Sequence, residues 1–226
     1  MNTTRSRAAT SFIVAVVFTL CLFASDAMAQ IGTGWTAVTY IKKIHLDDET
    51  GLHTFNYVTD KSVGSGTPCA RYHYLSSNDS EYFDLFDNRS NRAEIRLQNE
   101  YSTGSKQFQG YVRINSPLND ESLMQIFGST SGATQMMIRG YAASGGTIRS
   151  VGTPSVTLAT GIYGVERRIN VIHYQGNRIE LYCNGSLKGT GTDNEAVTNY
   201  WKYGCYGTLT TGAVQVRWRQ VRTYTK

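Results

Sequence analysis

Charged residues occupy every second position of one short segment, NRAEIRLQ, at residues 91–98. Arg92, Glu94 and Arg96 alternate there with alanine, isoleucine and leucine. Alternation with period two predicts a β-strand with one polar face and one buried face. A guanidinium group offers a planar fork of donors that matches a carboxylate. The row is charged but partly self-compensated, because Glu94 lies between the two arginines.

Three further segments place polar and aromatic side chains together on one strand face. These are Leu123, Gln125 and Phe127 in SLMQIFG, Gln135, Met137, Arg139 and Tyr141 in TQMMIRGY, and Tyr200, Lys202, Gly204 and Tyr206 in NYWKYGCYG. Side by side, such strands would form a groove of cationic, amide and aromatic groups, and the glycine would leave space for a ligand near the backbone. An ordinary solvated sheet face alternates in the same way and is the alternative interpretation.

The elements that must position these residues are predicted to be β-strands. The chain has 22 glycines and 15 tyrosines but only 3 prolines, a composition typical of strands and tight turns. Candidate strands follow one another at residues 106–115, 122–127, 134–141, 147–151, 169–175, 178–183, 200–206 and 213–224. Gly176-Asn177 and Asn184-Gly185 predict hairpin turns. Many short strands in one domain predict an all-β, two-sheet antiparallel β-sandwich or jelly roll, although the pattern at residues 31–90 is weaker.

Residues 1–29 are predicted to be a secretory signal peptide. Two arginines precede an apolar run at residues 12–24, and Ala27-Met28-Ala29 forms a small-x-small cleavage site. A membrane anchor is the alternative, but the apolar run is short for a transmembrane span. We therefore expect residues 30–226 to form one secreted, soluble, monomeric domain with a sizeable core and no membrane partner.

The predicted mature chain is mildly basic. Residues 1–29 hold two of the 22 Lys and Arg residues and one of the 17 Asp and Glu residues, which leaves 20 against 16 and a net charge of +4. The basic residues do not form the runs typical of nucleic-acid-binding tails, so we expect no nucleic-acid partner. A charge of this sign suits an acidic partner.

Three cysteines remain outside the predicted signal peptide: Cys69, Cys183 and Cys205. An exported chain could form one disulfide among them, and the sequence does not determine the pair. Cys183 shares a predicted strand face with Ile179 and Leu181, which would also suit a buried free thiol.

Three blocks of the sequence resemble the motifs of jelly-roll alginate lyases. RAEIR at residues 92–96, QIFG at 125–128 and YWKYGCY at 200–206 are similar, in order and spacing, to the family patterns Arg-Ser/Thr-Glu-Leu-Arg, Gln-Ile/Val-His and Tyr-Phe-Lys-Ala-Gly-x-Tyr. LMQIFG, RINVIHYQGNRIELYCNGSLKG and VRWRQVRTY look very like plant citrate-binding proteins of the same superfamily, which also contains fungal glucuronan lyases. The resemblance covers residues 90–224 and implies a concanavalin-like jelly roll.

The resemblance also implies a chemistry, β-elimination on a 1,4-linked uronate polymer. Abstraction of the proton at C5 places additional charge on the uronate carboxylate, which Arg92 or Arg96 and Gln125 would neutralise. One such donor is typically worth about 3 kcal/mol of transition-state stabilisation. Glu94 would hold the arginines, and Tyr206 matches the tyrosine that protonates the leaving oxygen. Such a lyase needs no metal and no cofactor.

One position departs from the alginate lyase motifs. Phe127 stands where those enzymes have histidine, and the citrate-binding relatives also have phenylalanine there. A histidine base is usually worth about 10²–10⁴-fold in rate. His73 lies on a candidate strand just before the arginine block and could replace it, whereas His173 is predicted to be structural. His45 and His53 lie in the weakly patterned region and carry no signal.

Two functions of different class are therefore compatible with the sequence. One is a secreted lyase of glucuronan or alginate, and the other is a non-catalytic protein that binds a small carboxylate or an acidic polysaccharide. A glycosidase or lectin is the third possibility, but Glu94 has no acidic partner in the matched strands, and a retaining glycosidase needs paired carboxylates. The residues expected to bind the ligand, beside those assigned to catalysis, are Arg96, Glu94, Arg139, Lys202, Tyr200 and Phe127.

Overall fold

A computed structural model describes residues 30–98, 100–128, 134–194, 198–207 and 212–226 of the chain. The predicted signal peptide at residues 1–29 lies outside the described residues. Within the described part, no helix has the length and apolar character that a membrane span requires.

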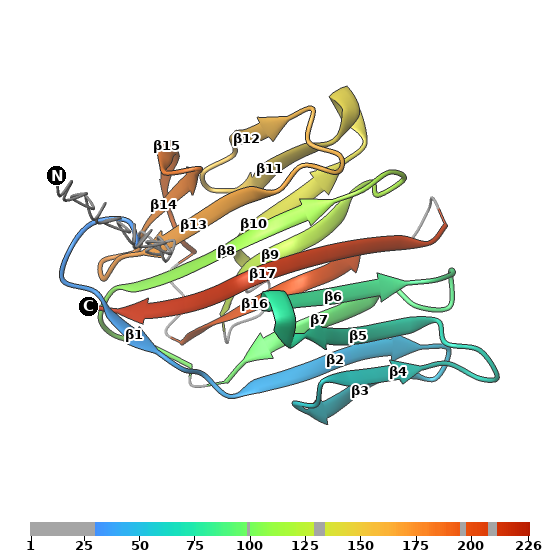
Figure 1. Cartoon of the computed structure of the whole chain (residues 1–226). Helices are drawn as coiled ribbons and strands as arrows, with labels where there is room; N and C mark the ends of the chain where they lie inside the picture. The colour runs from blue at the N-terminus through green and yellow to red at the C-terminus, as the bar shows by residue number, and fades with distance from the viewer. Residues whose placement is uncertain (1–29, 99, 129–133, 195–197, 208–211) are drawn as a thin grey trace, which may run out of the picture.

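Two antiparallel β-sheets pack face to face (Figure 1). Within the described residues, the nine-stranded sheet has the order β15-β14-β13-β8-β17-β6-β5-β4, with β1 paired to β17. Its strands are β1 (Thr36–Val38), β4 (Asp60–Val63), β5 (Ala70–Leu75), β6 (Ser80–Leu85), β8 (Lys106–Ile114), β13 (Arg167–His173), β14 (Arg178–Cys183), β15 (Ser186–Thr192) and β17 (Val214–Thr225). The predicted all-β sandwich is confirmed.

The second sheet carries the motif strands. Its order in the described part of the chain is β12-β11-β10-β9-β16-β7-β2-β3. The strands are β2 (Lys42–Asp48), β3 (Gly51–Asn56), β7 (Arg92–Leu97), β9 (Glu121–Gly128), β10 (Thr134–Tyr141), β11 (Thr147–Gly152), β12 (Thr157–Thr160) and β16 (Asn199–Gly207). Because β7, β16, β9 and β10 are consecutive neighbours, the three motif blocks lie side by side.

The eight predicted strands are all present, with ends that differ by two residues at most. The two predicted hairpins join β13 to β14 and β14 to β15. Gly176, Asn177, Asn184 and Gly185 all have positive φ, which is the geometry of a type I′ turn. In the weakly patterned region the described residues form six further strands, β1 to β6, which the sequence pattern did not predict individually.

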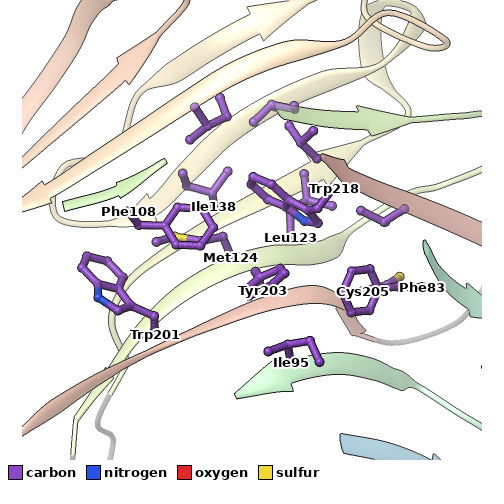
Figure 2. Close-up of a cluster of buried hydrophobic side chains, with 14 of the residues drawn as sticks. Phe83, Ile95, Phe108, Leu123, Met124, Ile138, Trp201, Tyr203, Cys205 and Trp218 are labelled. Carbon is purple, nitrogen blue, oxygen red and sulfur yellow. The ribbon is translucent and has the colours of Figure 1, made fainter. Parts of the chain in front are cut away.

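Large aromatic side chains fill the space between the sheets (Figure 2). Phe108 and Trp218 project from the nine-stranded sheet, with their ring centroids 5.4 Å apart. Tyr203 of β16 enters from the other sheet, 5.6 Å from Phe108 and 5.8 Å from Phe83. Successive strand residues point to opposite faces, so burial of Tyr203 and Trp201 turns Tyr200 and Lys202 outward.

Two register shifts change the faces predicted for β9 and β10. One shift lies next to Leu123, which is fully buried, and it brings Ser122 to the same face as Gln125. The other removes Gln135 from the outer face, since its Oε1 accepts a hydrogen bond of 2.7 Å from the Asn194 amide. The predicted placements of Leu123 and Gln135 on the polar face are therefore wrong, because a β-bulge reverses the alternation.

All three cysteines outside the predicted signal peptide are buried free thiols. The disulfide that the sequence allowed among Cys69, Cys183 and Cys205 therefore does not form. Burial raises the pKa of each thiol.

Candidate functional site

A groove of about 620 Å³ lies on the outer face of the eight-stranded sheet. Its lining residues are His45, Leu52, Arg92, Arg96, Gln125, Phe127, Thr134, Met137, Arg139, Tyr200, Lys202 and Tyr206. The sequence predicted that six of these residues, on four strands, would share one sheet face: Arg92, Arg96, Gln125, Arg139, Lys202 and Tyr206. That placement is confirmed, and Tyr200 and Phe127, which were also expected on these strand faces, line the same groove.

The strand register arranges these side chains in rows that cross the sheet. In the first row, Lys202 is directly opposite Arg96 on β7 and Gln125 on β9. Lys43 of β2 extends this row beyond Arg96, and Met137 of β10 extends it beyond Gln125. Directly opposite residues lie about 5 Å apart, so a ligand along this row meets a cation and an amide in succession.

A second row contains Tyr206, which is opposite Arg92 on β7 and Ser122 on β9. Arg139 of β10 is opposite Ser122 and completes the row. Between the two rows, His45 faces Glu94, and Glu94 faces Gly204. In this middle row, the position on β16 is therefore a glycine and has no side chain.

Gly204 is required for backbone reasons. Its φ is +145°, and an added Cβ would collide with the carbonyl oxygen of Ala93 and come within 2.9 Å of the Phe83 ring. A side chain at this position would point into the sandwich, so glycine allows β16 to bend at the register shift between Tyr203 and Tyr206.

Glu94 is a buried carboxylate at the centre of the groove's cations. Its Oε1 lies 2.5 Å from Lys202 Nζ, 3.4 Å from Arg92 Nη1 and 3.7 Å from His45 Nδ1. Burial alone would raise the pKa of Glu94, but these three groups outweigh burial and lower that pKa below its usual value. The structure supports the predicted role of Glu94 for Arg92 only, because Arg96 pairs with Glu100 instead. Lys202 and His45 are the other two groups beside Glu94.

Each arginine of β7 stacks on a tyrosine of β16. The Arg92 guanidinium lies 4.1 Å from the Tyr206 ring centroid, and the Arg96 guanidinium lies 4.1 Å from that of Tyr200. Lys202 Nζ is 5.7 Å from the Tyr206 ring centroid. Such contacts fix the guanidinium planes and place positive charge beside each phenol.

Phe127 lines the groove next to Tyr200. Its ring centroid lies 5.4 Å from that of Tyr200, and Lys202 Nζ lies 5.5 Å above it. Phe127 can therefore present an apolar face to a sugar ring but cannot exchange a proton.

Gln125 presents a polar group that is only partly paired, whereas all three guanidinium nitrogens of Arg139 donate hydrogen bonds. Gln125 Nε2 is 3.2 Å from Ser122 Oγ, and its buried Oε1 has no hydrogen-bond partner among the described residues. Arg139 Nε donates to the Asp120 carboxylate at 2.8 Å, and the other two nitrogens donate to the Asp120 carbonyl oxygen and the Met137 sulfur.

The described lining residues include four permanent cations and no carboxylate. Each cation has an ion-pair partner next to the groove: Glu94 for Arg92 and Lys202, Glu100 for Arg96, and Asp120 for Arg139. An anionic ligand would contact the cations that line the described groove.

His73 does not lie in this groove. It belongs to β5, in the other sheet, where it stacks on Tyr82 with a centroid distance of 4.6 Å and places Nδ1 3.4 Å from Asp84. The prediction that His73 supplies the missing base is therefore wrong. The chain passes from one sheet to the other between β6 and β7, so neighbours in the sequence lie on different faces of the molecule.

His45 is the groove histidine that the sequence interpretation missed. It projects from the centre of β2, is 7% exposed, and lines the groove beside Arg92 and Tyr206. The signal was present in KIHLD, where Lys43, His45 and Asp47 alternate with buried Ile and Leu. His173, by contrast, is buried outside the groove between Asp193 at 2.7 Å and the Tyr101 hydroxyl at 2.9 Å, as a structural histidine would be.

Solved structures of alginate lyases share this architecture. A polysaccharide lyase family 7 alginate lyase, AlgAT5, matches with a TM-score of 0.60 and 16% identity over 83% of this chain and 95% of that one. The alginate lyase PA1167 from Pseudomonas aeruginosa matches with a TM-score of 0.62 and 16% identity over 81% and 98%. The fold is that of the jelly-roll alginate lyases. Another match, AlyC3, was solved with dimannuronate (TM-score 0.61, 11% identity, 81% and 89% covered).

The sequence is similar to a different kind of protein. It is 33% identical over 137 residues to a citrate-binding protein from Hevea brasiliensis. The matched segment covers 59% of this chain and 56% of that protein, so it spans about half the length of the relative. No family model matches the chain. The structures that share this fold are alginate lyases, whereas the relative in sequence is a citrate-binding protein.

Proposed function

We propose that this protein is an exported lyase that cleaves a 1,4-linked uronate polymer, glucuronan or alginate, by β-elimination. The observation that carries the proposal is that one groove combines carboxylate-binding groups with two side chains able to move protons, His45 and Tyr206. Phe127 removes the histidine of the alginate lyase motif, but His45 returns an imidazole to the same groove from β2. Export by residues 1–29 would bring the enzyme to an extracellular polymer.

The proposed reaction begins with neutralisation of the uronate carboxylate. Arg92 and Gln125 would donate to its oxygens, and their hydrogen bonds would strengthen as the carbanion at C5 spreads its charge onto that group. Arg92 is held between Glu94 and the Tyr206 ring, so its orientation is set before the ligand arrives.

Proton transfer would then use the other two groups. Nδ1 of His45 faces Glu94, which leaves the second ring nitrogen for the ligand; this nitrogen would take the C5 proton. Tyr206 would give its phenolic proton to the departing O4 oxygen as the C4–O4 bond breaks and the C4–C5 double bond forms. Arg92 and Lys202 stabilise the resulting phenolate.

The test of the proposal is product formation by the mature protein. It should be incubated with glucuronan, polymannuronate, polyguluronate and a neutral glucan, and the unsaturated uronate followed by its ultraviolet absorbance. Absorbance that rises with one polyuronate and not with the neutral glucan supports a lyase. No unsaturated product from any polyuronate would contradict it.

Non-catalytic carboxylate binding is the second candidate, because Phe127 and the likeness to a citrate-binding protein both favour it. The same four cations would then hold citrate or an acidic polymer without turnover. Calorimetric titration with citrate, beside the product assay, distinguishes the two: tight citrate binding without product formation favours the binder.

A further inference from the structure

A second cationic surface lies on the opposite side of the molecule, on the outer face of the nine-stranded sheet. It consists of four arginines on neighbouring strands, with Tyr111 between them and one glutamate, and is called here the arginine strip: Arg113, Arg168, Arg217, Arg219, Tyr111 and Glu166. The arginines alternate along β8, β13 and β17 with core residues such as Val112, Ile169 and Trp218, so they face outward.

The register brings like charges directly opposite each other. Arg217 of β17 pairs with Arg113 of β8, and Tyr111 of β8 pairs with Arg219 on one side and Arg168 on the other. Like charges directly opposite in an antiparallel pair destabilise a sheet. A sheet that keeps such a pair on its surface would gain stability from a bound anion.

Internal compensation of these charges is incomplete. Glu166 pairs with both arginines of β17, at 2.7 Å from Arg217 Nη2 and 2.7 Å from Arg219 Nη2. Arg113 and Arg168 have no ion-pair partner among the described residues, and the Nε of each is buried without a hydrogen bond there. The strip therefore presents four guanidinium groups against one carboxylate.

The strip is narrow, and carboxylates border it. β6, next to β17, carries Asp84 on the same outer face, where Gln215 donates to it at 2.7 Å. β14, next to β13, carries Glu180, to which Tyr182 donates at 2.7 Å. Three strands span about 10 Å. Such a width suits one polymer chain, whereas the bordering carboxylates would repel the broad, densely charged backbone of a nucleic-acid duplex.

We propose that the arginine strip is a second binding site for a single chain of acidic, carboxylate-bearing polysaccharide. The inference of this ligand class rests on the proposed function of the groove, since a polyuronate is the polyanion that the groove would select. Guanidinium forks would pair with successive uronate carboxylates across β13, β8 and β17. The strip and the groove lie on opposite faces. Binding at the strip would therefore keep the protein on the polymer while the groove releases one polymer segment and binds another.

The experiment compares two double variants that each remove two arginines from this outer face. Arg113→Gln with Arg168→Gln alters the strip, and Arg71→Gln with Arg178→Gln is the control, since those arginines lie outside the strip and pair with Asp60 and Glu180. Affinity electrophoresis in gels with long polyuronate, neutral glucan or single-stranded DNA measures binding without requiring catalysis. Circular dichroism confirms folding of each variant.

The strip variant is expected to bind the long polyuronate about tenfold more weakly, and the control variant within twofold of wild type. Binding of a short uronate oligosaccharide, and its cleavage if the protein is a lyase, should not change. Equal polymer affinity in the two variants would overturn the proposal, as would a strip-dependent affinity for DNA greater than that for polyuronate. A protein that binds polyuronate through the strip but makes no product would contradict the lyase proposal alone.

Discussion

At the scale of residues, the two groups proposed to transfer protons lie among the groove's cations. Tyr206 lies under Arg92 and beside Lys202, and His45 lies beside Glu94. Tyr206→Phe and His45→Ala can separate catalysis from binding. Each removes one group proposed to transfer a proton and leaves the groove's cations in place.

Tyr206→Phe removes one hydroxyl and keeps the ring on which Arg92 stacks. For a lyase we expect polymer affinity within a few-fold of wild type and a loss of turnover of about 10²-fold or more, because the lost proton acts only in the transition state. Initial rates and direct binding, measured on the same preparations, test this. An unchanged turnover number would exclude Tyr206 as the acid.

His45→Ala should lower turnover by about 10²–10⁴-fold if His45 is the base. His73→Ala is the matched control, since it removes a histidine from the outer face of the other sheet and should leave turnover unchanged. Product assays on both variants give the answer. Full activity of His45→Ala would make Tyr206 both base and acid.

Glu121 should make the free energy of unfolding depend on pH. Burial raises the pKa of this carboxyl from 4.5 to about 7, so the folded state binds a proton that the unfolded state releases between these pH values. The contribution of Glu121 to the free energy of unfolding should therefore be fully present below about pH 4.5 and be lost as pH rises to about 7, by up to about 3 kcal/mol. Urea titrations across this range should show a decline that Glu121→Gln abolishes. The same decline in Glu121→Gln would assign it to other groups.

At the scale of elements, one buried carboxylate links the two sheets. Glu81 of β6 accepts from Tyr72 of β5 at 2.8 Å, and also from Tyr203 of β16 and Lys42 of β2, each at 2.8 Å. β16 also carries the groove residues Tyr200 and Tyr206, so this network fixes the position of that strand relative to the other sheet. Burial and the Glu81 charge raise the pKa of Tyr203, which keeps its hydroxyl a donor.

Glu81→Ala should lower the free energy of unfolding by about 3–5 kcal/mol, because it leaves two buried hydroxyls without an acceptor and one lysine without its partner. Asp60→Ala is the control: it breaks an exposed ion pair with Arg71 and should cost about 1 kcal/mol or less. Urea denaturation of both variants at neutral pH measures the difference. Equal losses would show that the Glu81 network is not a link between sheets.

At the scale of the whole molecule, both outer faces of the sandwich carry clustered cations, four in the groove and four arginines in the strip. Binding of a polyuronate should therefore weaken as salt rises from low to physiological ionic strength, since charges on a surface are screened over about 10 Å at 0.1 M. Calorimetry in a series of sodium chloride concentrations tests this. Affinity that does not depend on salt would point to recognition of neutral sugar groups.

Period-two alternation and turn residues by themselves determine much of this molecule. Eight strands, two hairpins and the shared face of Arg92, Gln125 and Tyr206 follow from local side-chain direction, which a strand imposes on its own sequence. The motif blocks also predicted that β7, β9 and β16 would carry one site.

Tertiary structure alone decided which strands share a sheet and where the bulges fall. His45 enters the groove and His73 leaves it because β2 pairs with β7 while β5 pairs with β6 in the other sheet, a choice made by non-local hydrogen bonds. Leu123 is buried because a bulge reverses the alternation of β9. Local pattern fixes the direction of a side chain within its strand, but pairing between distant segments decides which side chains meet.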